Sequence, residues 1–143
     1  MTQWLLLHYK LPPEPSALRV SAWRKLKRLG AILFQDTVWV LPCTARTQEQ
    51  FQWLAAEIEE IGGEATLWEA RPALLGKDDT LIAQFSAQVD EGYHALLAQL
   101  ESPEADLETL SRQYQQVLSR DYFQSEAGQR VRQALLARRG DMQ

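Results

Sequence analysis

The first 72 residues alternate between short apolar runs and two helical stripes, and this alternation restricts the fold more than any other feature. Apolar or β-branched runs at residues 3–9, 31–34, 37–41 and 64–71 end at a proline or at a short polar pair, as strands do. Residues 16–29 and 47–61 instead carry apolar side chains at helical spacing and end at glycines. The sequence therefore predicts the order strand, helix, strand, strand, helix, strand.

This order within about seventy residues predicts an α+β class with a ferredoxin-like βαββαβ core, in which both helices cover one face of the sheet. The rest of the chain carries three apolar stripes at helical spacing and predicts a C-terminal helical extension, made of a helical hairpin and a last helix. We expect residues 1–72 to form the core and residues 73–143 to form the helical extension, packed on the core or on a second subunit.

Several local signals refine this prediction. Ser16, after a proline, is the expected N-cap of the first helix, and Thr47 with Gln50 has the spacing of a capping box for the second. His8 lies in an apolar strand and is expected in the core, whereas His94 is expected at the surface. Neither histidine has a partner at a metal-ligand spacing, so we expect no metal and no cofactor.

The distribution of charge is more informative than the net charge of −4. Residues 1–46 hold seven basic and two acidic residues, residues 47–110 hold two and fourteen, and residues 111–143 hold six and three. The chain has one cysteine, no run of eighteen apolar residues and no signal-peptide pattern. We therefore expect a cytoplasmic protein without a membrane partner. Because the basic residues gather near the start of the chain, we expect any binding of anions to be local to the first helix.

The first helix concentrates the basic residues on one side. With Leu18 at zero and 100° per residue, the apolar side chains lie between 0° and about 80°, and Lys27, Arg24 and Arg28 lie between about 180° and 280°. Such a face suits phosphate or another oxyanion, and Trp23 at its border can stack on a base. A solvated helix face, or ion pairs with the acidic middle of the same chain, is the alternative.

Four stretches carry a family resemblance. The long stretch Ser16–Pro42 resembles the signature of the N-terminal domain of ChrB, the bacterial chromate-resistance regulatory protein. Trp4–Pro12 (WLLLHYKLP), Leu54–Ala65 (LAAEIEEIGGEA) and Arg120–Phe123 (RDYF) support it. The pattern is more distantly similar to the ferredoxin-like domain of PaaX-type repressors and of the CRISPR spacer-acquisition nucleases.

The resemblance implies a transcriptional regulator of a chromate-efflux operon, acting as a homodimer on promoter DNA, with chromate or another oxyanion as a further candidate ligand. Full ChrB proteins have a second, C-terminal domain, so we expect this chain to supply one half of such a system. It has no recognisable helix-turn-helix. The expected contacts with phosphate or oxyanion are basic side chains that position the protein on the backbone: Arg19, Arg24, Lys25, Lys27 and Arg28, with Lys10 as an outside candidate.

Two other function classes remain open. A dimerisation or scaffold module would pair its basic helix with acidic residues of a partner, and a small thiol-dependent, oxyanion-handling enzyme would use Cys43. We expect a non-enzymatic protein. In the related nucleases an aspartate at the end of the first strand binds the metal, whereas this chain has Lys10 there and a solitary Asp36 after the second strand.

Tryptophans and tail arginines add surfaces whose role the sequence leaves open. The chain has five tryptophans, most of which are expected in the core or an interface; they are Trp4, Trp23, Trp39, Trp53 and Trp68. The tail arginines could extend a phosphate-binding surface, pair with the acidic middle of a second subunit, or lie in solvent: Arg130, Arg132, Arg138 and Arg139.

Overall fold

The computed structural model describes residues 3–36 and 38–141, and the chain divides into two compact units, residues 1–79 and 80–143. The first unit holds the sheet and two helices, and the second is helical. Helix α3 begins in the first unit and continues into the second. Thr37, the expected first residue of the third strand, lies outside the described residues.

The first unit follows the predicted order of elements, and the predicted α+β class is confirmed. Its elements are β1 (Trp4–Lys10), α1 (Ser16–Leu29), β2 (Ile32–Gln35), β3 (Val38–Pro42), α2 (Ala45–Glu60) and β4 (Glu64–Ala70). The strands form one antiparallel sheet in the order β2-β3-β1-β4. The two central strands are therefore β3 and β1, and β2 and β4 form the edges.

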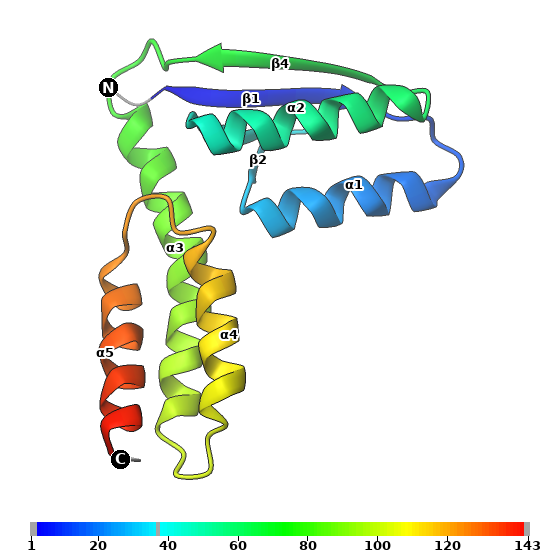
Figure 1. Ribbon diagram of the computed structural model, residues 1–143. Helices are drawn as coiled ribbons and strands as arrows, with labels where there is room; N and C mark the ends of the chain where they lie inside the picture. Colours follow the sequence, from blue (N-terminus) through cyan, green and yellow to red (C-terminus); the bar gives the residue numbers. More distant parts are fainter. Residues whose placement is uncertain (1–2, 37, 142–143) are drawn as a thin grey trace. The chain divides into compact units, whose positions relative to one another are not determined.

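Both α1 and α2 lie on one face of this sheet (Figure 1), as the pattern predicted. Leu26 of α1 and Phe51 of α2 are fully buried, as are Leu5 and Leu7 of β1. Because side chains alternate across a strand, Leu5 and Leu7 share a face of the sheet. Burial of these groups is the main stabilisation of the unit, at roughly 25 cal/mol for each Å² of apolar surface removed from water.

The helix starts differ from the predicted ones. Helix α1 begins at Ser16 itself, with Pro15 as the capping residue and no side-chain hydrogen bond, so the prediction of a Ser16 cap was wrong. The capping box of α2 joins Thr44 and Thr47 rather than Thr47 and Gln50. Thr47 is fully buried, and its hydroxyl donates to the carbonyl oxygen of Pro42 at 2.6 Å. This bond satisfies the buried hydroxyl of a residue that lies in the first turn of α2 rather than at its cap.

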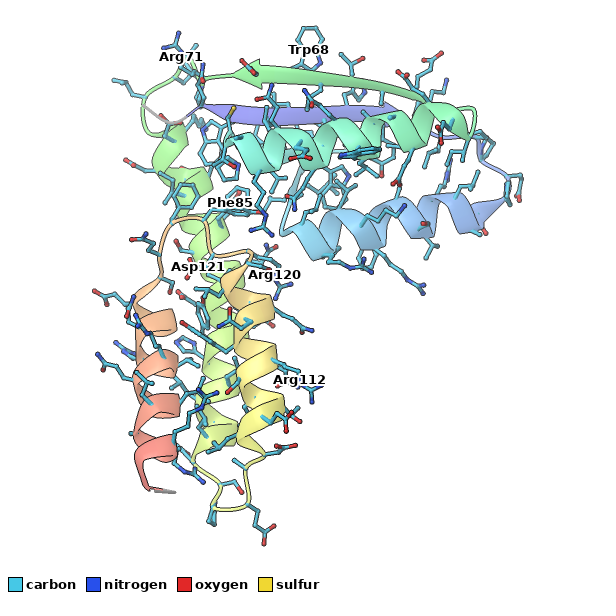
Figure 2. All side chains as sticks on the ribbon, in the orientation of Figure 1. Trp68, Arg71, Phe85, Arg112, Arg120 and Asp121 are labelled. Atoms are coloured by element: carbon cyan, nitrogen blue, oxygen red, sulfur yellow. The ribbon has the colours of Figure 1, made fainter. Side chains whose placement is uncertain are left out.

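The face of the sheet opposite the helices carries His8 and Trp68. These residues belong to the set that alternates with Leu5 and Leu7, and His8 pairs with Thr66 in the register of β1 and β4. His8 is exposed, so its predicted place in the core was wrong, whereas His94 is exposed as expected. Figure 2 shows Trp68 pointing away from α1 and α2, and 57% of it is exposed.

The second unit packs α3 (Lys77–Leu100), α4 (Leu107–Leu118) and α5 (Glu126–Asp141) side by side (Figure 1). This confirms the predicted helical hairpin followed by a last helix. The buried core takes residues from all three helices: Val89, Tyr93, Leu96, Leu100, Leu110, Tyr114, Val117, Ala127, Val131 and Leu135. Two leucines of these helices, Leu118 of α4 and Leu136 of α5, lie outside this core and are exposed.

The connection between α4 and α5 contains the Arg120–Phe123 stretch, and its role within the second unit is structural. Tyr122 and Phe123 each pack with a ring centroid 6.0 Å from that of Phe85. Asp121 accepts hydrogen bonds from the hydroxyl of Tyr93, at 2.9 Å, and from the backbone N–H of Ser125 just before α5. Figure 2 shows Asp121 and Arg120 in this connection. The carboxylate thus ties the start of α5 to α3.

Candidate nucleic-acid interface

Helix α1 presents the basic surface that its sequence predicted. Ala22 and Leu26 are buried toward the sheet, which turns Arg24, Lys27 and Arg28 to the exposed side. Gly30 ends the helix in the left-handed conformation with φ of 80°, and its N–H satisfies carbonyl groups of the last turn. Lys27 and Arg28 in that last turn also complement the negative end of the helix dipole.

Three of these cations are exposed and can meet an external anion: Arg24, Lys27 and Arg28. We call them the α1 cationic face. Among the described side chains of the first unit, no carboxylate lies at ion-pair distance from Arg24, Lys27 or Arg28. The ammonium nitrogen of Lys27 lies 5.8 Å from the ring centroid of Trp23, which is 51% exposed. Arg24 and Arg28 are four residues apart and so lie on one side of the helix, about 6 Å apart along its axis. The face combines forked donors with an exposed aromatic ring.

Lys25 has a different environment, since its ammonium group forms an ion pair with Glu57 of α2. Both side chains are about half exposed, so the pair contributes at most about 1 kcal/mol to stability. Lys25, Arg28, Trp53 and Glu57 line part of a groove of about 210 Å³ between α1 and α2. Glu57, which belongs to the acidic middle of the chain, therefore neutralises Lys25 and lines the same groove as Arg28.

Arg19 and Lys10 lie apart from the α1 cationic face. Arg19 is exposed near Tyr9, where burial raises the pKa of the Tyr9 hydroxyl while a hydrogen bond with Trp39 and the charge of Arg19 act to lower it. Lys10 is exposed at the end of β1, opposite Glu64 of β4 in the sheet register. Its backbone carbonyl approaches Gly63 so closely that a Cβ there would lie 2.6 Å from it.

Trp53 is a feature that the sequence reasoning did not single out. It is 66% exposed on α2, whereas Phe51, Leu54 and Ile58 of the same helix are buried. The helical spacing contains this signal, because Trp53 is about 160° from Phe51 around the helix. Trp4 and Trp39 are in the core, whereas Trp23, Trp53 and Trp68, which were also considered for the core or an interface, are more than half exposed.

Cys43 follows β3 in a setting that disfavours the thiolate. Burial raises the pKa of the Cys43 thiol, and the nearby charge of Glu69 raises it further. Since the thiolate is the nucleophile, both effects lower the reactivity of this sulfur. Among the described residues there is no group of three or more His, Cys, Asp or Glu side chains that could hold a metal ion. Nor is any helix in the described ranges long and apolar enough to cross a membrane.

These elements define an α+β protein whose sheet is covered on one face by two helices, one of them with an exposed basic surface. The chain belongs to the ChrB N-terminal family: the family model described as "Protein ChrB, N-terminal" matches residues 19–99. Protein ChrB of Cupriavidus metallidurans is 28% identical over 144 residues, covering 91% of this chain. This chain spans 43% of the length of that relative. No solved structure matches the chain.

Proposed function

We propose that this chain is a non-enzymatic regulatory protein of chromate resistance, which acts in the cytoplasm as a DNA-associated homodimer. Membership of the ChrB N-terminal family supports the regulatory role. The antiparallel order β2-β3-β1-β4 supports our interpretation of the first unit as a ferredoxin-like fold. Chromate or another oxyanion is a second candidate ligand of the same basic residues.

The observation that carries the proposal is the α1 cationic face. Arg24 and Arg28 supply forked donors for phosphate oxygens, and Lys27 supplies a third positive charge beside Trp23. Contacts of this kind fix the position of the protein on the duplex and give affinity that is independent of sequence. Lys25 has a positioning role, because its pair with Glu57 joins α1 to α2.

The test measures binding of the full chain to a duplex from the DNA upstream of its own gene, over a range of salt concentrations. Wild-type affinity should fall steeply with salt, by about 0.9 log units per log unit of salt for each phosphate neutralised. The double variant Arg24→Ala/Arg28→Ala should bind more weakly to every duplex, with a salt slope lower by about 2 if each arginine contacts one phosphate.

A matched control separates local contacts from total charge. The double variant Arg46→Ala/Arg71→Ala removes the same charge from exposed sites outside α1. It should keep most of the affinity and the salt slope. Equal losses in the two double variants would remove α1 from the model, and no binding by the wild-type chain at low salt would refute the proposal.

A dimerisation module without DNA binding is the second candidate function, and the three exposed tryptophans favour it. Aromatic residues such as tryptophan are enriched in the buried core of protein interfaces. This candidate predicts that the wild-type chain associates with itself but does not shift the duplex at low salt. Because this module would pair its basic helix with acidic residues of the partner, it also predicts that the Arg24→Ala/Arg28→Ala variant associates more weakly than the wild-type chain.

A further inference from the structure

Helix α5 carries an exposed surface on which an apolar side chain lies between two arginines, an arrangement typical of a protein interface. Arg132 lies four residues before Leu136, and Arg139 lies three residues after it. These spacings place all three on one side of the helix, over about 10 Å of its length. Leu136 is 55% exposed between the two arginines. We call these residues the α5 basic stripe.

The α5 basic stripe lines a groove of about 840 Å³ in the second unit. Leu107, Tyr114 and Leu135 give the groove apolar walls, and Arg112 of α4 adds a third positive charge. Glu108 is the acidic residue among the residues that line it. Arg139 reaches Ser111 of α4 with a hydrogen bond of 2.7 Å, so its guanidinium group lies over the groove. The groove therefore suits an apolar side chain flanked by carboxylates.

Helix α2 carries the complementary arrangement. Its exposed Trp53 has Glu49 four residues before it, Glu57 four residues after it and Glu60 seven residues after it. All three carboxylates lie within about 40° of Trp53 around the helix, so they form one face, which we call the α2 acidic face. Glu57 pairs with Lys25, so Glu49 and Glu60 supply the charge that this face offers to a partner. The α5 basic stripe thus places Leu136 between positive charges, and the α2 acidic face places Trp53 between negative charges. The two surfaces are therefore complementary in charge.

We propose that the α5 basic stripe of one copy packs against the α2 acidic face of a second copy. Trp53 would enter the groove beside Leu136, while Arg132 and Arg139 would meet Glu49 and Glu60. Tryptophan and arginine are the residues that dominate protein interfaces, and complementary charge fixes which surfaces meet. If both contacts form within one pair, two copies bury two exposed tryptophans.

This inference concerns the homodimer of the proposed function, and it is tested by mass rather than by DNA binding. Its failure and the failure of DNA binding are therefore distinguishable. The experiment is sedimentation of the full chain at several concentrations and at low and high salt. The wild-type chain should associate beyond its 16.4 kDa monomer at low salt and dissociate as salt screens the charges.

Two charge-reversal variants provide the decisive comparison. Arg132→Glu/Arg139→Glu gives both surfaces negative charge, and Glu49→Arg/Glu60→Arg gives both surfaces positive charge. Each variant alone should stay monomeric. An equimolar mixture should associate again, because the reversed α5 of one variant meets the reversed α2 of the other. Association of either variant at wild-type strength, or no association in the mixture, would overturn the proposal.

Single substitutions keep the proposal testable if a charge reversal disturbs folding. Trp53→Gln should raise the dissociation constant by roughly 30-fold or more, as expected for a tryptophan at an interface centre. Trp68→Gln is the matched control, since Trp68 is similarly exposed, at 57% against 66%, but lies on the sheet. If Trp68→Gln weakens association and Trp53→Gln does not, copies meet through the sheet and the proposal is wrong. A wild-type chain that stays at 16.4 kDa at every concentration would also refute it.

Discussion

Arg138 of α5 donates a hydrogen bond to the backbone carbonyl oxygen of Leu100, the last residue of α3. Its guanidinium group also donates to the carbonyl oxygen of Ser102, at 3.1 Å. The last carbonyl groups of a helix have no partner within that helix. Arg138, which lies 38 residues further along the sequence, donates the missing hydrogen bond to one of these carbonyl groups. It thereby joins the end of α3 to the last turns of α5.

Arg138→Ala is therefore expected to destabilise the second unit. A hydrogen bond from a charged group contributes roughly 1.5–3 kcal/mol, and the partial exposure of this site favours the lower end. Urea unfolding followed by circular dichroism checks the prediction. Arg130→Ala removes an exposed arginine from the same helix and should change the free energy of unfolding by less than about 0.5 kcal/mol. Equal effects of the two variants would contradict a capping role for Arg138.

A side chain at Gly128 should destabilise the second unit, because α5 meets the ring of Tyr93 there. A Cβ at this position would lie 2.9 Å from Cε2 and Cζ of Tyr93, which is fully buried. Gly128→Ala is expected to cost about 1–3 kcal/mol, as overpacking does. Gly140 lies in the same helix with nothing within 4 Å of such a Cβ, so Gly140→Ala should be neutral or stabilise by up to about 1 kcal/mol. Thermal unfolding of the two variants should therefore shift in opposite directions or leave Gly140→Ala unchanged.

The stability of the second unit should fall at alkaline pH because of Tyr93. Burial raises the pKa of the Tyr93 hydroxyl above its usual value of 10, and its hydrogen bond to Asp121 raises it further. The folded chain thus holds a proton that the unfolded chain releases more easily. The resulting stabilisation is complete below pH 10 and is lost as the pH rises above that value.

Tyr93→Phe should lower stability at neutral pH and flatten this alkaline loss. Urea midpoints between pH 8 and pH 11 would measure both effects. Tyr114→Phe is the control, because the Tyr114 ring packs in the same core with its centroid 6.1 Å from that of Tyr93. It should keep the steep alkaline loss. If Tyr93→Phe follows the wild-type pH profile, another group causes the loss.

The element order, the class of fold and the exposed basic side of α1 could all be predicted from periodicity along the chain. The errors arose where contacts that periodicity does not contain decide the outcome. Thr44 rather than Thr47 caps α2, with the Thr47 hydroxyl bound to the carbonyl of Pro42, and His8 is exposed because it faces away from both helices. The pairing of Lys25 with Glu57 joins two helices, at residues 32 positions apart. The periodicity of a single helix cannot predict such a pair. The exposure of Trp53, by contrast, follows from the spacing of α2, although it was not among the predictions.

The hydrogen bond from Thr47 to Pro42 has a consequence for the way the first unit opens. It joins the last residue of β3 to the first turn of α2, and the same hydroxyl oxygen accepts one of the two capping bonds, from the backbone N–H of Thr44. Fraying of the helix start therefore releases the strand end as well. Amide hydrogens on the two sides of this junction should exchange with solvent at a common rate, as one cooperative unit rather than as a strand and a helix.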